Sequence, residues 1–241
     1  MIFDQSEFDV RCEWGEQGAL HLAPISDAII IVDVLSFSTC VSVATVRGAE
    51  ILPYDSREKS ATEFARSMGA DLAGVRGQSR YSLSPATFAD IPAGVRVVLA
   101  GINGSRLSLL TGRTATLAGS IRNARAVAEA ALRLGRKIAV VPAGERWKEG
   151  GALRVAVEDL IGAGAIIRHL RVSLSPEAGV AMSVFQSVEH RLLSVLTQCS
   201  SGKELVAMGF EQDIRLCADI DVDDCAPILK DGAYVMAEPV A

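Results

Sequence analysis

The run Ala28–Val32 constrains the fold most, because all five of its residues are apolar and Asp33 follows it directly. Strands that bury both faces belong to mainly parallel sheets covered by helices on both sides, whereas strands of half-exposed sheets alternate apolar and polar residues. The run therefore predicts a central parallel strand in an α/β protein.

Strand-like and helix-like segments alternate along most of the chain. Short β-branched runs predict strands at 50–53, 71–75, 96–100, 115–117 and 137–142. Helical periodicity predicts helices between them, at 37–47, 57–68, 106–110 and 124–134. Longer helical segments follow at 153–170 and 176–199, the second with a break, and further strands are predicted at 213–218 and within 227–236.

This alternation predicts a three-layer α/β/α fold with a mainly parallel, mixed central sheet. The sequence contains no repeat of 20–50 residues and no linker-like stretch. We expect residues 1–241 to form a single α/β unit, and an arrangement of two intertwined lobes stays open. The stretch 74–85 is the longest predicted loop, and long loops in compact domains often carry function.

The composition excludes several classes of protein. The chain has 241 residues, 49% of them hydrophobic and 22% charged, and a net charge of −5 spread along its length, which argues against a nucleic-acid groove. Five cysteines without a Cys-x-x-Cys pair are typical of reduced thiols in the cytoplasm. No apolar run is long enough to span a bilayer, and the N-terminus does not resemble a signal peptide. We therefore expect a cytoplasmic protein without nucleic-acid or membrane partners, and its compact size is compatible with a homodimer.

Small, polar or acidic residues follow four of the predicted strands, in the segments 33–40, 101–106, 118–123 and 142–146. Ligands of open α/β sheets bind outside the carboxyl ends of the strands. Asp33 is the sharpest of these residues, because a carboxylate that closes an apolar strand must be paired, bind a metal or cap the next helix. A capping role is the alternative to a functional one, although Ser36 suits the cap better.

Two of these segments suit an anion. Asn103, Gly104 and Ser105 would present amides and a hydroxyl at the start of a helix, where anions bind well, although an ordinary Asn-Gly turn is the alternative. The segment 119–123, which ends on Asn123, has the same two interpretations. Neither is followed by the lysine of a Walker loop, and no Gly-x-Gly-x-x-Gly occurs, which disfavours a nucleotide-binding domain.

Acids and arginines complete the set of candidates. Glu158 and Asp159 are neighbours on a predicted helix, so at most one of them can face a site squarely, and a solvated helix face is the alternative. With Asp33 and Glu145 they would offer the two or three carboxylate oxygens that usually hold Mg²⁺.

Four arginines are candidate forks for phosphate or carboxylate groups, namely Arg76, Arg106, Arg146 and Arg154. The acidic run 219–224 lacks the central glycine and closing glutamate of a calcium loop, and we expect it to be solvated.

In this order the segments resemble the 2-phosphosulfolactate phosphatase family from about residue 29 to residue 227. The resemblance rests on Val-Asp-Val-Leu-Ser-Phe-Ser-Thr at 32–39, Asn-Gly-Ser at 103–105, Gly-Ser-Ile-Arg-Asn-Ala at 119–124 and Ala-Gly-Glu-Arg at 143–146. Val-Glu-Asp-Leu-Ile-Gly-Ala-Gly at 157–164 and Asp-Ile-Arg-Leu-Cys at 213–217 extend it.

The resemblance implies an α/β/α fold and Mg²⁺-dependent hydrolysis of (R)-2-phospho-3-sulfolactate, a small phosphorylated organic acid, to 3-sulfolactate and phosphate. Asp33, Glu158 and Asp159 would be the catalytic carboxylates, and Asp33, Glu145 and Asp159 would hold the metal. The expected substrate contacts are Ser38, Thr39, Arg76, Asn103, Gly104, Ser105, Asn123 and Arg146.

The chain also departs from the family pattern. Ser36 stands where the family has arginine, Val75 stands in place of an acid, and a threonine-rich run before Asn-Gly is replaced by the residues 99–102. Because the ligand of the family carries several anionic groups, these changes predict an altered ligand preference. The alternative is a non-catalytic protein that binds a phosphorylated metabolite and keeps the same fold.

Overall fold

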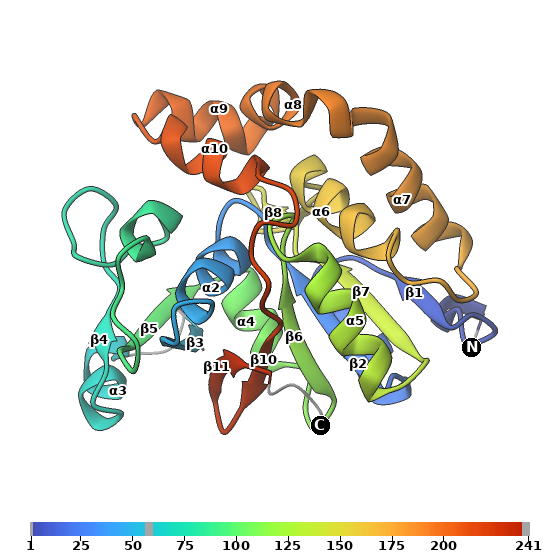
Figure 1. Ribbon diagram of the computed structural model, residues 1–241, viewed down its shortest axis with the longest axis horizontal. Helices are drawn as coiled ribbons and strands as arrows, with labels where there is room; N and C mark the ends of the chain where they lie inside the picture. The colour runs from blue at the N-terminus through green and yellow to red at the C-terminus, as the bar shows by residue number, and fades with distance from the viewer. Residues whose placement is uncertain (1, 56–59, 238–241) are drawn as a thin grey trace.

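The computed structural model describes residues 2–55 and 60–237, and its centre is a nine-stranded sheet (Figure 1). In spatial order the strands are β1 (Val10–Cys12), β7 (Ile138–Pro142), β2 (Ala28–Val32), β6 (Ala115–Gly119), β10 (Pro227–Lys230), β11 (Ala233–Met236), β3 (Glu50–Asp55), β5 (Arg96–Gly101) and β4 (Asp71–Leu72). A small hairpin outside this sheet pairs β8 (Glu145–Arg146) with β9 (Leu153–Arg154).

Strand β2 occupies the central position that its composition predicts. It lies parallel to β7 and to β6, with Val32 opposite Pro142 and Gly119. The isoleucines of β2 are fully buried, and burying a side chain of that size contributes roughly 1.5–3 kcal/mol. The carboxyl ends of these strands therefore meet at one edge of the sheet, directly beside Asp33.

The hairpin formed by β10 and β11 separates two groups of parallel strands. It is antiparallel internally and also toward its neighbours β6 and β3. Three antiparallel pairings in succession mean that β3, β5 and β4 run opposite to β2 along the ladder. Sheets twist by roughly 20–25° per strand, so five steps from β2 to β5 accumulate a turn on the order of 100°. The segment that follows the carboxyl end of β5 nevertheless reaches the carboxyl end of β2, because the N–H of Gly104 donates to Asp33.

Helices cover both faces of the sheet, as the alternating pattern predicts. Ile30 and Val32 face a core shared with α5 (Ala124–Leu134), α6 (Val157–Ile167) and α7 (Pro176–Val188). Ile29 and Ile31 face α1 (Gly15–Leu22) and α4 (Gly104–Leu109). Around β3 and β5, α2 (Phe37–Thr45) covers one face and α3 (Ala61–Ser67) the other. This arrangement confirms the three-layer α/β/α architecture with a mixed sheet.

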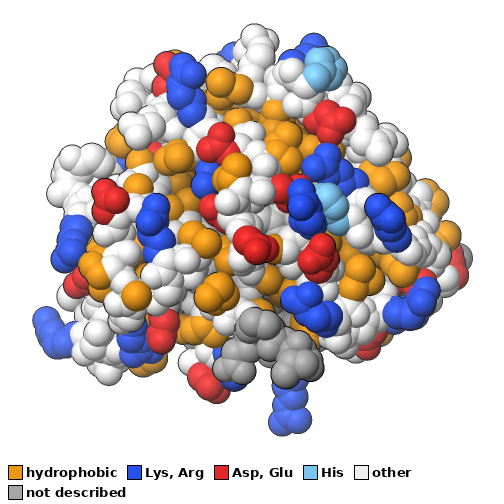
Figure 2. Space-filling model, viewed as in Figure 1, with side chains coloured by type: hydrophobic (Ala, Val, Ile, Leu, Met, Phe, Trp, Pro, Cys, Tyr) orange, Lys and Arg blue, Asp and Glu red, His pale blue; other side chains and the backbone are white. Residues whose placement is uncertain are grey.

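Three further helices, α8 (Leu192–Gln198), α9 (Ser200–Ala207) and α10 (Glu211–Ala218), lie across the top of the molecule as drawn in Figure 1. Short 3₁₀ turns occupy η1 (Ile2–Asp4), η2 (Ala23–Ile25), η3 (Pro85–Phe88) and η4 (Glu189–Arg191). Within the described ranges, no helix has both the length and the apolar character needed to cross a membrane. On the face drawn in Figure 2, the acidic and basic side chains of the described residues are interspersed.

The structure corrects several predicted elements. The segment 213–218 is not a strand but part of α10, because Asp213, Ile214 and Cys217 are buried at helical spacing. The helix predicted from residue 153 begins at Val157, since Leu153 and Arg154 belong to β9. The break predicted within 176–199 is the turn η4 between α7 and α8. Residues 57–59 of the predicted helix 57–68 lie outside the described residues.

Candidate active site

Asp33 stands at the carboxyl end of β2 and is 9% exposed. Its Oδ1 accepts a hydrogen bond from the backbone N–H of Phe37 (3.2 Å), and its Oδ2 accepts one from the N–H of Gly104 (2.8 Å). The first bond caps α2, whereas the hydroxyl of Ser36 makes no cap bond. Asp33 also lines a cavity of about 170 Å³, called the Asp33 cavity below. The carboxylate therefore caps a helix and faces a cavity at the same time.

Position 104 has no room for any residue larger than glycine. A Cβ at this position would lie 2.8 Å from Oδ2 and 2.9 Å from Cβ of Asp33, and still closer to the ring of Phe37. Real Cβ atoms do not approach other atoms so closely, and only glycine lets the backbone amide reach the carboxylate. The Asn-Gly pair after β5 thus joins the two strand ends.

Glu158 and Asp159 are both buried, with 2% and 3% of their surfaces exposed, which excludes a solvated helix face. Asp159 Oδ1 accepts a hydrogen bond from the N–H of Val34 (2.8 Å), and Oδ2 accepts one from Gly144 (2.9 Å). The two neighbours diverge as expected, since Glu158 lies against the thiol of Cys199, whose pKa burial and the charge of Glu158 raise to about 12.

Glu145 completes a group of four carboxylates, Asp33, Glu145, Glu158 and Asp159, which we call the acidic centre. Its Oε2 accepts a hydrogen bond from Nδ2 of Asn103 (3.0 Å), and it lines the Asp33 cavity. Burial, followed by the charge of Glu145, raises the pKa of Asp33 to about 6. Burial also raises the pKa of Glu145, and burial with the charge of Asp33 raises that of Asp159 well above its ordinary value. The centre therefore holds an excess of negative charge in a poorly solvated place.

An arginine reaches the same cavity from the predicted loop 74–85. Arg76 donates from Nη1 to Oδ2 of Asp213 in α10 (2.9 Å) and from Nη2 to the hydroxyl of Ser36 (3.0 Å). Its side chain is 19% exposed and lines the Asp33 cavity. A guanidinium thus stands beside Ser36, at the position where the family pattern carries an arginine.

Four predicted substrate contacts turn their side chains into the fold. The hydroxyls of Ser38 and Thr39 donate to the carbonyls of Asp33 and Val34 (both 2.8 Å). The hydroxyl of Ser105 donates to the carbonyl of Leu99 (2.7 Å). Asn123 accepts from the amide and hydroxyl of Ser120 and donates to the carbonyl of Ala118. The buried polar atoms of these four side chains already have partners within the protein.

Two of the candidate arginines pair with acids outside the acidic centre. Arg106 forms ion pairs with Glu16 and Asp55, and Arg146 contacts Glu16 at 3.3 Å. The fourth, Arg154, stands on β9 and donates to the hydroxyl of Ser201 at 3.2 Å.

The sequence did not point to the residues of α9 and its C-cap that line the Asp33 cavity, namely Ser201, Glu204, Leu205 and Met208. Nor did it show that one acid of the run 219–224, which was expected to be solvated, is buried, whereas Asp219 and Asp224 are exposed as expected. Asp223 is 7% exposed and accepts two hydrogen bonds from Arg122, at 2.8 and 2.9 Å. The prediction for this residue is wrong because its partner lies 101 positions away in the chain.

The acidic centre is not by itself a complete metal site. Within residues 2–55 and 60–237, no three His, Cys, Asp or Glu side chains form a ready-made group for a metal ion. Mg²⁺, however, is usually held by one or two carboxylates together with water and substrate phosphate. Asp33 and Glu145 line one cavity, and burial together with the charge of Glu145 raises the pKa of Asp33, which fits such a site. Asp159 is not among the residues that line this cavity.

The fold and the polar groups after β2 and β5 define the class: an α/β protein with a polar site outside the carboxyl ends of its parallel strands. The chain belongs to the 2-phosphosulpholactate phosphatase family, whose model matches residues 17–232. This match confirms the resemblance inferred from the motifs.

Named relatives cover nearly the whole chain. A "probable 2-phosphosulfolactate phosphatase" of Carboxydothermus hydrogenoformans is 30% identical over 222 residues, which is 87% of this chain and 90% of that protein. The "2-phosphosulfolactate phosphatase" of Methanothermobacter thermautotrophicus is 29% identical over 223 residues, with 89% and 92% covered. A "probable 2-phosphosulfolactate phosphatase" of a Synechococcus species is 30% identical over 213 residues, with 82% and 86% covered.

Proposed function

We propose that this protein hydrolyses a small acidic phosphomonoester, 2-phospho-3-sulfolactate, in the Asp33 cavity. One observation carries the proposal. Asp33, which follows β2, accepts a hydrogen bond from Gly104, which follows β5, and both line a cavity that Arg76 also lines. Family membership and the names of the relatives support the reaction and the substrate.

In the proposed reaction water supplies an oxygen to phosphorus, the P–O bond to the sulfolactate carbon skeleton breaks, and 3-sulfolactate and phosphate leave. Arg76 would bind phosphate oxygens, because Asp213 and Ser36 hold its guanidinium at the rim of the cavity. Positively charged groups fixed beforehand around a transferring phosphoryl group stabilise its charge in the transition state.

We further propose that the reaction depends on Mg²⁺ held by Asp33 and Glu145, with Asp159 as a third candidate. The support is electrostatic, because the charge of Glu145 raises the pKa of Asp33 and the charge of Asp33 raises that of Asp159, and a divalent cation would neutralise that charge. When bound, the ion would polarise the phosphate oxygens. Asn103 would orient Glu145 through the hydrogen bond that it donates.

A non-catalytic binding protein is the second candidate, and the serine at position 36 favours it. The contact between Arg76 and Ser36 weakens this alternative, since it supplies a guanidinium at the same place. Both candidates require an anion in the Asp33 cavity, so only turnover separates them.

The deciding experiment measures phosphate release from phosphosulfolactate, phospholactate and isopropyl phosphate, with Mg²⁺ and with EDTA. We expect Mg²⁺-dependent release from phosphosulfolactate and loss of that release in EDTA. Release that EDTA leaves unchanged would refute the metal dependence alone. If the folded protein binds 3-sulfolactate but releases no phosphate from any ester, the binding protein replaces the phosphatase.

A further inference from the structure

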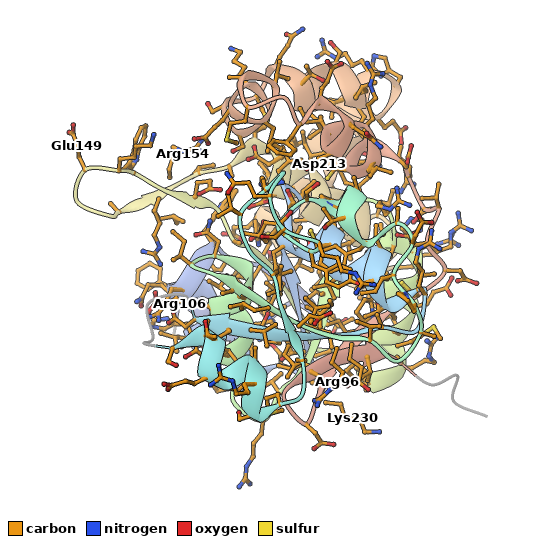
Figure 3. The ribbon with its side chains drawn as sticks, turned by 90° about the vertical axis from the view of Figure 1, so that its left-hand side faces the viewer. Arg96, Arg106, Glu149, Arg154, Asp213 and Lys230 are labelled. Atoms are coloured by element: carbon orange, nitrogen blue, oxygen red, sulfur yellow. The ribbon has the colours of Figure 1, made fainter. Side chains whose placement is uncertain are left out.

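The β8–β9 hairpin brings one arginine to the acidic centre and turns another away. In its register Glu145 pairs with Arg154, and Arg146 pairs with Leu153. Residues opposite each other on paired strands share a face, and successive residues alternate between faces. Glu145 and Arg154 therefore lie on one face of the hairpin, and Arg146 lies on the other. Figure 3 shows the hairpin projecting from the molecule, with Glu149 near its tip and Arg154 nearer its base.

The contacts of Glu145 and Arg146 identify the two faces. Glu145 bonds to Asn103 and lines the Asp33 cavity, whereas Arg146 points toward Glu16. Because Arg154 shares the face of Glu145, it stands beside the acidic centre.

Arg154 keeps most of its hydrogen-bonding capacity free. Its bond to the hydroxyl of Ser201 uses one of the five N–H donors of a guanidinium. Over the described part of the chain, Arg154 forms no ion pair, whereas Arg76, Arg106 and Arg146 each pair with a carboxylate. The charge of Arg154 acts on Glu145 without a direct ion pair, so this half-buried guanidinium is free to bind a planar oxyanion with two parallel hydrogen bonds.

Arg154 and Asp33 line two neighbouring cavities that share lining residues. Arg154 lines a cavity of about 790 Å³, which we call the hairpin cavity, together with Trp147, Lys148, Ser200 and Arg146, whose guanidinium pairs with Glu16. Glu145 and Glu204 line both this cavity and the Asp33 cavity of about 170 Å³. A phosphate group bound in the smaller cavity would leave the rest of a short organic acid room to extend into the larger one.

We propose that Arg154 binds the second oxyanion of the substrate, a carboxylate or sulfonate on the carbon skeleton, and so selects acidic phosphomonoesters over neutral ones. This inference rests on the proposed function, because it takes the phosphate to lie in the Asp33 cavity. Arg154 is then a specificity-determining residue, while Arg76 serves the phosphate.

The test is calorimetric titration of wild-type protein, Arg154→Ala and Arg154→Lys in the presence of Mg²⁺. The probes are 3-sulfolactate, lactate, 2-hydroxyethanesulfonate and inorganic phosphate. For Arg154→Ala we expect the Kd of 3-sulfolactate to rise at least tenfold and that of phosphate to stay unchanged, with Arg154→Lys in between. Lactate carries only the carboxylate, and 2-hydroxyethanesulfonate carries only the sulfonate. The probe whose Kd rises in Arg154→Ala therefore identifies the oxyanion that Arg154 binds. Arg133→Ala removes an exposed arginine of α5 and is the charge-matched control.

Equal binding of 3-sulfolactate by wild type and Arg154→Ala would overturn the inference, as would a parallel loss of phosphate binding. In either case, hydrolysis of phosphosulfolactate by the wild type would leave the proposed function standing. Conversely, Arg154-dependent binding of 3-sulfolactate without any phosphate release would support the oxyanion site and refute the phosphatase.

Discussion

At the scale of single residues, Asp33 combines two roles that sequence reasoning treated as alternatives. It caps α2 through Phe37 and faces the Asp33 cavity with the same carboxylate. The sequence identified this residue because a charge directly after an apolar strand is costly unless it has partners. Its partner Gly104 lies 71 positions further along the chain, so the contact itself could not be predicted from local pattern.

Replacing Asp33 by asparagine is expected to reduce kcat at least a hundredfold, because the amide removes the charge and cannot accept both backbone bonds as the carboxylate does. Steady-state phosphate release from phosphosulfolactate measures the effect. Asp71→Asn, on the exposed edge strand β4, is the matched control and should retain wild-type kcat. Full activity of Asp33→Asn would remove this carboxylate from the mechanism.

The same variant should alter how stability depends on pH. The folded-state pKa of Asp33, about 6, exceeds its ordinary value of 3.8, so folding favours the protonated form. Its contribution is therefore complete below about pH 4 and is lost as the pH rises through 6; a shift of this size corresponds to on the order of 3 kcal/mol. In EDTA, urea titrations from pH 4 to pH 8 should show a weaker decline for Asp33→Asn than for the wild type. Parallel declines would contradict the raised pKa.

Gly104→Ala tests the close approach of the two strand ends. The added Cβ would overlap Asp33 and Phe37, and overpacking of this kind costs about 1–3 kcal/mol. We expect a lower free energy of unfolding and a large loss of activity. Gly179→Ala, in α7, is the matched control, because a Cβ there meets no atom within 4 Å.

At the scale of elements, long regular segments were predicted well and short ones were not. The alternating pattern located β2, β5, β6, β7 and α5, whose many residues repeat one period. The hairpin β8–β9 has strands of two residues each, which is too short for any period to show. The segment of α10 was mistaken for a strand because Ile214 and Leu216 alternate with polar neighbours. Helix α9 therefore entered the site only through the structure, and only the structure separates Arg154 from the other candidate arginines.

Helix α10 positions Arg76 through Asp213, which also accepts a hydrogen bond from Ser84 at 2.7 Å. Asp213→Asn keeps the shape of the side chain but removes its charge, so the guanidinium is held less firmly. We expect KM to rise about tenfold, with a smaller change in kcat. Glu211→Gln alters an exposed acid of the same helix and should leave KM unchanged. A wild-type KM for Asp213→Asn would show that Arg76 needs no such anchor.

At the scale of the whole molecule, we expect the excess charge of the acidic centre to link stability to a cation. Mg²⁺ that binds the folded state alone should raise Tm by about 5 °C or more at saturation near pH 8. Near pH 5 protonated carboxylates would compete with the ion, and the rise should be small. Thermal unfolding with Mg²⁺ and with EDTA at both pH values measures this difference. An equal response at both pH values would place the ion elsewhere.

The position of the β10–β11 hairpin has a consequence for how the chain is made. On the ribosome, these strands emerge after every other strand of the described sheet, so β6 and β3 wait as open edges that offer unpaired backbone groups. The nascent polypeptide is therefore most exposed to wrong partners just before residues 227–236 leave the exit tunnel. Slow translation of that stretch would lengthen this vulnerable interval, and chaperones that bind nascent chains would have their greatest effect there.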